Sequence, residues 1–269
     1  MKKLVMFFLL LGTSAFAQVK ETRKVADFNK VKVSQSIKLD FTYGKTKSTV
    51  VEVEEKSDLQ YVKTEVLADG LLKVYIDVPK GMKSLKIKNV RVYVSNPSLE
   101  GVGVSSSAKF HLLNSIKAKS FKVTTSSSGD YEGALVQTDN LTLEASSSSE
   151  IEGSFEVTNN TSLATSSSAE IEISLKGNKA SIVSSSSSTV KVKGTANDVV
   201  AEASSSASVD ASGFKVKTLD ARASSSGSID MNVSETVSGR ASSAGQITYT
   251  GTAKLTSKKV SSAGQIKKG

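Results

Sequence analysis

Three short segments of the chain each carry two acidic residues separated by a single residue. The three pairs begin 20 residues apart and comprise Asp130, Glu132, Glu150, Glu152, Glu170 and Glu172. If the segments lie side by side, the carboxylates share one surface, and either solvent and nearby lysines relieve their repulsion, as on an ordinary solvated face, or a hard cation such as Ca²⁺ binds between them. The same crowding raises the pKa of a carboxylic acid, which a polysaccharide-cleaving general acid requires. These six residues are the candidate cation ligands or catalytic groups.

Few other residues in the chain are suited to catalysis or metal binding. There is no Cys, and His111 is the only His. Disulfides, Cys-ligated zinc, iron–sulfur clusters, cysteine nucleophiles and sites with two His ligands are therefore excluded. A Ser/His/Asp triad would have to use His111. The many serines recur in equivalent motifs without a base beside each, so we do not expect them to act as nucleophiles.

A serine motif recurs through the C-terminal part of the chain and shows which elements must carry the carboxylates. Its first serines, 18 to 21 residues apart, are Ser105, Ser126, Ser146, Ser166, Ser185, Ser204, Ser224, Ser242 and Ser261. Five positions after each stands an apolar residue: Phe110, Tyr131, Ile151, Ile171, Val190, Val209, Ile229, Ile247 and Ile266. A flexible Ser-rich linker has no reason to keep an apolar residue in phase. The motif therefore marks a structural repeat.

Each repeat alternates apolar and polar residues in the manner of a β-strand. Leu141, Leu143 and Ile151 alternate with Glu144 and Glu150, and successive side chains of a strand leave opposite faces. About twenty residues at roughly 3.3 Å each give a coil perimeter of about 65 Å. Such coils stack about 4.8 Å apart, and parallel crossovers favour a right-handed turn. We predict an all-β fold, a right-handed parallel β-helix (β-solenoid) of about 20 residues per coil, over residues 105–269.

The second serine of each motif has the inward parity of this alternation. A Gly, Ala or Ser follows two positions later, which indicates a tight corner. We expect the hydroxyl to point inward and to bond to the coil above or below. This structural serine ladder would comprise Ser106, Ser127, Ser147, Ser167, Ser186, Ser205, Ser225, Ser243 and Ser262.

Residues 18–104 also show the alternation of strands. The pattern predicts strands over residues 31–41, 49–53, 71–78 and 85–94, and one helical turn at 57–62 with Ser57 or Asp58 as its cap. We expect this N-terminal β-rich segment to be continuous with the solenoid and to cover the edge of its first coil, because stacked coils need covered ends. Residues 18–269 would then form one domain.

Positive charge is concentrated in the N-terminal part of the chain. The net charge is +9, and the densest cluster comprises Lys80, Lys83, Lys86, Lys88 and Arg91. Such a cluster attracts an anionic glycan, a lipid surface or a nucleic acid. We interpret it as a solvated strand face whose lysines discourage edge pairing. The absence of interleaved aromatic residues argues against a nucleic-acid partner.

Residues 1–17 have the features of a cleaved signal peptide. Lys2 and Lys3 precede an apolar run, and Ala15-Phe16-Ala17 matches the small-x-small pattern that is cut before Gln18. No Cys follows to carry a lipid anchor, and no later stretch is apolar enough to span a membrane. We expect an exported protein in the periplasm, at the cell surface or outside the cell.

Several segments resemble a known family. They include Phe28-x-x-Val31-x-Val33, Asp69-Gly70-Leu71-Leu72-Lys73-Val74 and Ser242-Ser243-Ala244-Gly245-Gln246-Ile247. The chain resembles the head GIN domain family (DUF2807), an exported β-helical module common in Bacteroidetes and described as an auto-transporter adhesin. Ser replaces the first Gly of the family's Ser-Gly-Ser-Gly-x-Ile motif. The resemblance implies adhesion and brings no catalytic residues, and we expect no β-barrel translocator in this chain.

Three functional hypotheses follow. The first is a non-catalytic envelope or surface protein that binds a glycan or a protein through a flat β-helix face, without a cofactor. The second is a polysaccharide-active enzyme, or a Ca²⁺-binding β-helix, that uses the stacked carboxylates. The third is ice binding by outward Ser and Thr ladders, which flanking Glu and Lys residues make a weak match.

Overall fold

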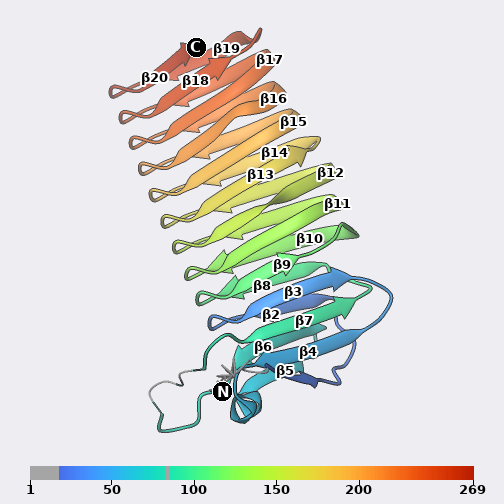
Figure 1. Cartoon of the computed structure of the whole chain (residues 1–269). Coiled ribbons are helices and arrows are strands. Elements are labelled where there is room, and N and C mark those ends of the chain that lie inside the picture. Colours follow the sequence, from blue (N-terminus) through green and yellow to red (C-terminus); the bar gives the residue numbers. More distant parts are fainter. Residues whose placement is uncertain (1–17, 83–84, 86) are drawn as a thin grey trace, which may run out of the picture.

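The computed structural model describes residues 18–82, 85 and 87–269. The expected signal peptide, together with Lys83 and Lys86 of the basic cluster, lies outside these residues. The described part folds into 20 strands and one short 3₁₀ helix, stacked as successive coils along one axis (Figure 1). The predicted β-solenoid is confirmed, with about 8 turns of roughly 20 residues each.

The solenoid is built from parallel strands that each pair with strands one coil earlier and one coil later. Its elements are β8 (Gly101–Ser105), β9 (Lys109–Leu112), β10 (Ile116–Ser126), β11 (Asp130–Ala145), β12 (Glu150–Thr165), β13 (Glu170–Lys176), β14 (Lys179–Ser184), β15 (Thr189–Ala203), β16 (Ser208–Ala223), β17 (Ser228–Ala241), β18 (Gln246–Thr250), β19 (Lys254–Val260) and β20 (Gln265–Lys268). Adjacent coils contribute every pairing in this series, so each coil is stabilised only by its neighbours.

The apolar residues five positions after each first serine form one buried column. Ile151 lies opposite Ile171, Val209 lies opposite Ile229, and Ile247 lies opposite Ile266. All members of the column are at most 6% exposed. At the lower end the column widens into stacked aromatic rings, Phe41 on Phe110 and Phe110 on Tyr131, with ring centroids 6.0 and 5.7 Å apart. A single core runs through the whole stack.

The serine motif forms the corner between two strands, and the predicted inward ladder is wrong. The second and third residues of each motif are exposed, and both have φ near +55°, the left-handed conformation. The main chain makes the ladder instead: the N–H of Ser148 donates to the carbonyl of Ser167 at 3.0 Å, and Ser128 donates to Ser147 at 3.1 Å. The alternation of inward and outward side chains holds only along an extended strand, and two left-handed residues interrupt it at the corner. The hydroxyl of the second serine therefore faces solvent.

Inward hydroxyls do occur, but at neighbouring positions. Thr125 and Ser149 share a buried hydrogen bond of 2.8 Å, and Thr165, Ser184 and Ser188 form a buried cluster with bonds of 2.9 to 3.0 Å. These residues stand just before the first serine or at the fourth position of the motif. The fourth position is buried in all nine motifs, as the run of small residues there predicts. These five hydroxyls are tolerated in the core because each finds a partner.

The N-terminal segment adds coils to the solenoid out of sequence order. β2 (Lys30–Val33) and β3 (Lys38–Tyr43) lie between the coil of β8 and β9 and the coil of β6 (Leu71–Ile76) and β7 (Arg91–Asn96). The single strand expected over 31–41 is in fact two strands, separated by a tenth copy of the corner. In that copy Gln35 and Ser36 have φ of 63° and 58°, and the N–H of Ser36 donates to the carbonyl of Ser106.

Antiparallel strands cover the N-terminal end of the stack. β4 (Ser48–Val53) pairs with β7, β1 (Val19–Thr22) pairs with β4, and β5 (Val62–Val66) pairs with β6. Glu52 on β4 is 2% exposed and is bonded by Lys20 of β1 at 2.8 Å. The helical turn is a 3₁₀ helix, η1 (Lys56–Gln60), which begins after Glu55 without a side-chain cap, because neither Ser57 nor Asp58 stands at its cap position.

The corner conformation predicts how its serines respond to substitution. Ser148→Val should lower the free energy of unfolding by about 1–2 kcal/mol, because a β-branched residue is strained at positive φ. Ser148→Gly should be neutral or slightly stabilising, and Ser148→Ala should have little effect, since Ala244 and Ala263 occupy the same position with φ near 60°. Chemical denaturation of the wild type and the three variants measures these changes in the free energy of unfolding. Equal losses for Val and Gly would contradict the left-handed corner.

Tyr131 predicts a second effect on stability. The side chain is fully buried, its hydroxyl has no partner among the described residues, and burial raises the pKa of the phenol. An unbonded buried hydroxyl costs about 1–3 kcal/mol. Tyr131→Phe should therefore keep or raise the melting temperature. A clear fall in the melting temperature would show that the hydroxyl is bonded.

Candidate functional site

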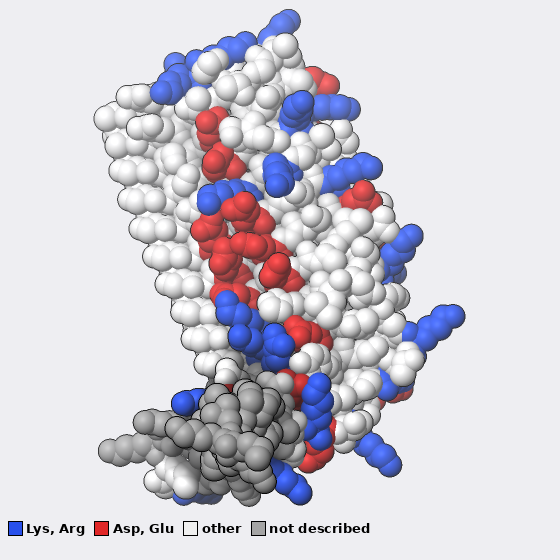
Figure 2. Space-filling model, in the orientation of Figure 1, with Lys and Arg blue, Asp and Glu red and all other residues white. Residues whose placement is uncertain are grey.

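The structure brings the six predicted carboxylates together on one outer side of the solenoid. Asp130, Glu150 and Glu170 form one row across β11, β12 and β13, and Glu132, Glu152 and Glu172 form a second row two residues along. Figure 2 shows them as a red stripe beside the uncharged edge formed by the corners. We call these six residues the acidic stripe. The prediction that neighbouring coils place these carboxylates on one face is confirmed by the strand register.

Cationic side chains close the acidic stripe at both ends. On the coil below, Lys109 pairs with Asp130 at 2.7 Å. On the coil above, Lys191 pairs with Glu170 at 2.7 Å and with Glu172 at 3.5 Å. Figure 2 shows blue groups above and below the red stripe. Across residues 18–82, 85 and 87–269, no ion pair reaches the central residues Glu150 and Glu152.

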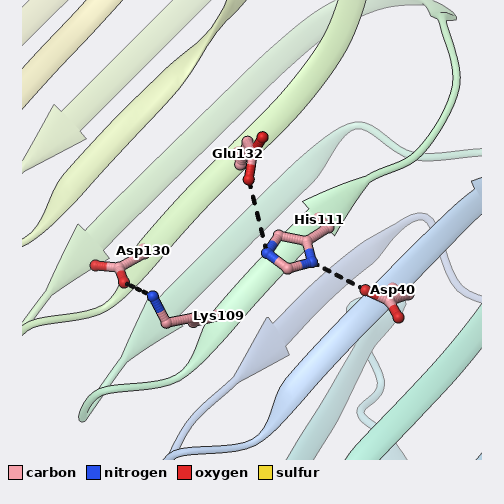
Figure 3. A network of polar contacts seen from close by, with 5 residues as sticks. All are labelled: Asp40, Lys109, His111, Asp130 and Glu132. Atoms are coloured by element: carbon pink, nitrogen blue, oxygen red, sulfur yellow. Dashed lines mark hydrogen bonds and ion pairs between the residues drawn. The ribbon is translucent and has the colours of Figure 1, made fainter.

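His111 extends the stripe downward into the N-terminal coils. Its Nδ1 lies 3.0 Å from Asp40 and its Nε2 lies 3.8 Å from Glu132 (Figure 3). Asp40 and His111 are 71 residues apart in sequence and directly opposite in register. Sequence reasoning missed this contact. The signal that could have predicted it is the tenth corner, which begins at Ser34. Asp40 stands six positions after Ser34, as His111 and Glu132 stand six positions after Ser105 and Ser126, so the three residues occupy equivalent positions on successive coils.

The centre of the stripe carries unrelieved negative charge. The pKa of Glu150 is raised, first by partial burial and then by a hydrogen bond to Glu152 and by the charges of Glu152, Glu170 and Asp130. All three effects disfavour the ionised carboxylate. Glu150 is therefore the carboxyl group of the stripe that gains most from protonation or from a nearby cation.

The stripe does not form a preformed metal centre. Within the described part of the chain, no group of three or more His, Asp or Glu side chains is placed to hold a metal ion. The hollow at the stripe has a volume of about 180 Å³ and is lined by Lys109 and His111 as well as by carboxylates. The predicted calcium ligands therefore share a surface without converging on one point, because side chains in register leave a sheet in parallel.

The strands that lead into the corners form a second outer side with a different character. On it, β12, β14 and β15 present Ala164, Val183 and Val200, and both valines are 41% exposed. A shallow hollow of about 520 Å³ runs along this side from Lys32 to Ser185. We call this surface the hydroxyl face, because most of its remaining outward residues are Ser or Thr: Ser105, Thr124, Ser126, Thr142, Ser146, Ser162, Ser166, Ser181 and Ser185.

Aromatic residues are absent from the outside of the solenoid. The aromatic side chains of residues 101–269 are Phe110, Phe121, Tyr131, Phe155, Phe214 and Tyr249, and all are buried. Sugar rings commonly stack on exposed aromatic rings in binding clefts, and enzyme pockets are concave and mostly apolar. Neither feature accompanies the acidic stripe or the hydroxyl face.

These features define a repetitive β-solenoid with long, open outer sides. Residues 27–159 and 153–253 match the family model DUF2807, described as "Putative auto-transporter adhesin, head GIN domain". The chain belongs to this family. A comparison with curated proteins finds no match.

Solved structures share the fold at low sequence identity. A "putative adhesin" from Parabacteroides merdae is 18% identical, with a TM-score of 0.70, over 94% of this chain and 96% of that chain. A "putative adhesin" from Parabacteroides distasonis is 18% identical, with a TM-score of 0.68, over 94% and 97%. A "Putative lipid binding protein" from the same species is 19% identical, with a TM-score of 0.67, over 94% and 96%. The described residues contain no helix of the length and apolarity that a membrane span requires.

The pKa of Glu150 predicts a pH dependence of stability. A carboxyl group whose folded pKa is raised contributes its stability fully below the unfolded pKa and loses it as pH rises through the folded pKa. Glu150→Gln should therefore raise the melting temperature at pH 7.5, and the gain should vanish near pH 4. Glu235→Gln, at an exposed carboxylate on β17, is the matched control and should shift little at either pH. A gain from Glu150→Gln that persists at pH 4 would contradict charge repulsion as its cause.

Proposed function

We propose that this protein is an exported, non-catalytic adhesin-like surface protein that binds a glycan or a protein through the hydroxyl face. The observation that carries the proposal is the form of this face, an open side that stays in register over successive coils and exposes Ala164, Val183 and Val200. Hydroxyls and charged residues such as Glu202 and Asp220 surround them. An exposed apolar patch within a polar surround is typical of a contact surface. The family description supports adhesion.

Two properties support binding over catalysis. The hollows are shallow and open, whereas enzymes bury most of a substrate in a concave pocket. Ion pairs with Lys109 and Lys191 engage the outer carboxylates of the acidic stripe, and Glu150 and Glu152 lie side by side without a third group to orient them. A general acid and base need a defined position for the reacting group between them. This arrangement does not favour the polysaccharide-active alternative.

Export is part of the proposal and has its own test. The features of residues 1–17 predict cleavage before Gln18. Mass spectrometry of the protein from cells should find Gln18 at the N-terminus, and protease added to intact cells should degrade it if it is displayed on the surface. An uncleaved N-terminus, or a protein recovered only with cytoplasmic markers, would contradict export.

The role of the hydroxyl face predicts the effect of a paired substitution. Val183→Glu with Val200→Glu should reduce binding of the mature chain to immobilised envelope fractions at least about tenfold, because a charge buried in a contact without a partner is costly. The control is Ser186→Asp with Ser205→Asp, which adds the same charge to exposed corner residues of the same coils. Titration by biolayer interferometry measures both. Equal losses for the two variants would show that added charge, and not the face, determines binding.

A further inference from the structure

The N-terminal end of the hydroxyl face contains a trough formed by two outward glycines. Gly101 and Gly103 on β8 occupy outward positions, and the equivalent outward positions on β10, β11, β12, β14, β15, β16 and β17 all carry side chains. The missing side chains leave a hollow of about 340 Å³. This hollow and the 520 Å³ hollow of the hydroxyl face share Lys32, Gly103 and Thr124, so the two form one continuous trough.

Lysines surround the glycines of this trough. Lys30 and Lys32 lie opposite Gly101 and Gly103 on the coil below, and Lys122 lies opposite Gly101 on the coil above. A Cβ atom added to either glycine would lie 3.4 Å from the Cγ atom of its lysine, so the aliphatic stems cover the trough floor. Lys73 stands beside Lys32 in register on the next coil. Four ammonium groups thus belong to adjacent coils at one end of the face.

The charges in the trough are incompletely balanced. Lys30 and Lys73 lie 3.6 and 3.7 Å from the carboxylates of Asp69 and Glu65. Lys30 also donates to the carbonyl of Asp69 at 3.3 Å, and Lys73 lies over the ring of Tyr75. Lys122 pairs with Glu144 at 2.8 Å. Lys32 has no ion pair with any described residue. Glu100 also lines the hollow and accepts a hydrogen bond from Asn29 at 2.9 Å. Adjacent like charges such as Lys32 and Lys73 repel each other, and an anion between the coils relieves that repulsion.

The rest of the trough is suited to a polyhydroxylated chain. Beyond Thr124 its lining includes Ser126, Ser146 and Ser166 on successive coils, which can donate and accept hydrogen bonds. Glu144 also lines it, and its carboxylate is paired with Lys122. The aromatic side chains of residues 101–269 are all buried. On the next coil the partly exposed ring of Tyr75 is covered by Lys73, whose Nζ lies 4.1 Å from the ring centroid, so a neutral sugar finds no free ring beside the trough. A ligand that is held here must therefore be bound by charge and by hydroxyl groups.

We propose that this trough binds an acidic polysaccharide, with a carboxylate or sulfate of the chain between Lys32 and Lys122 and its hydroxyls along the serines. The inference rests on the proposed adhesin function and names the ligand class. The lysines that surround Gly101 and Gly103 support an anionic occupant. The length of the hollow, from Lys32 to Ser185, supports a polymer over a single small anion.

The test uses the mature chain and polygalacturonate as the probe, with fully methyl-esterified polygalacturonate as the neutral control of the same backbone. Wild type should bind the acid and not the ester, with an affinity that falls as salt rises. Lys32→Gln with Lys122→Gln should weaken binding at least about tenfold. Lys215→Gln with Lys217→Gln, which removes the same charge from exposed positions on β16, should change it less than about twofold. Thermal melts confirm that both variants are folded.

The outcomes separate this proposal from the proposed function. Equal loss in the two paired variants, or equal binding of acid and ester, would overturn the trough as the site. Binding to phosphatidylglycerol vesicles without binding to polygalacturonate would overturn the polysaccharide assignment. If the wild-type protein does not bind polygalacturonate but still binds envelope fractions through Val183 and Val200, the acidic-polysaccharide assignment is wrong and the proposed adhesin function stands. If it binds polygalacturonate through Lys32 but not envelope fractions, the trough stands and the adhesin function does not.

Discussion

The structure depends on one main-chain interaction repeated between successive corners. The N–H of the third motif residue donates to the carbonyl of the second residue on the next coil, as Ser148 does to Ser167. Both residues must be left-handed for these groups to point along the stack, which costs free energy at each non-glycine residue. Small, unbranched Ser and Ala meet this requirement at a lower cost than β-branched or bulky residues. Because the corner bonds align each coil with its neighbours, the strands on both sides inherit one register.

A fixed register turns single residues into columns. Inside, it places Ile151 over Ile171, and the uniform apolar column is favourable because identical shapes stack without voids. Outside, the same register places Glu150 beside Glu170, and a row of identical charged residues is unfavourable because like charges repel. The residue type in these outer rows therefore changes from coil to coil, and Lys109 and Lys191 stand at the two ends of the acidic stripe. The outer sides are therefore heterogeneous although the coils are nearly equivalent.

The sequence predicts what depends on alternation and misses what depends on local departures from it. The buried column and the rows of the acidic stripe follow from a period of two within strands and about twenty between them, so both were predictable. The prediction of inward-pointing second serines was wrong because the alternation of inward and outward side chains does not continue across two left-handed residues. The tenth corner was missed because Gln35 and Ile37 replace the usual residues, and with it the contact between Asp40 and His111. The insertion of β2 and β3 between later coils has no local signal.

The division between a constrained interior and a free exterior explains how such a fold can carry a binding surface. Replacing Ile151 would leave a cavity between two coils and cost several kcal/mol, on the scale of about 2–5 kcal/mol for a large-to-Ala change. An outward residue contacts only solvent and its two neighbours in the row, so its replacement costs little. Gly101 and Gly103 can therefore open a trough, and Val183 and Val200 can expose an apolar patch, without any change in the path of the chain. Specificity in this solenoid is set coil by coil on a backbone that the corners hold constant.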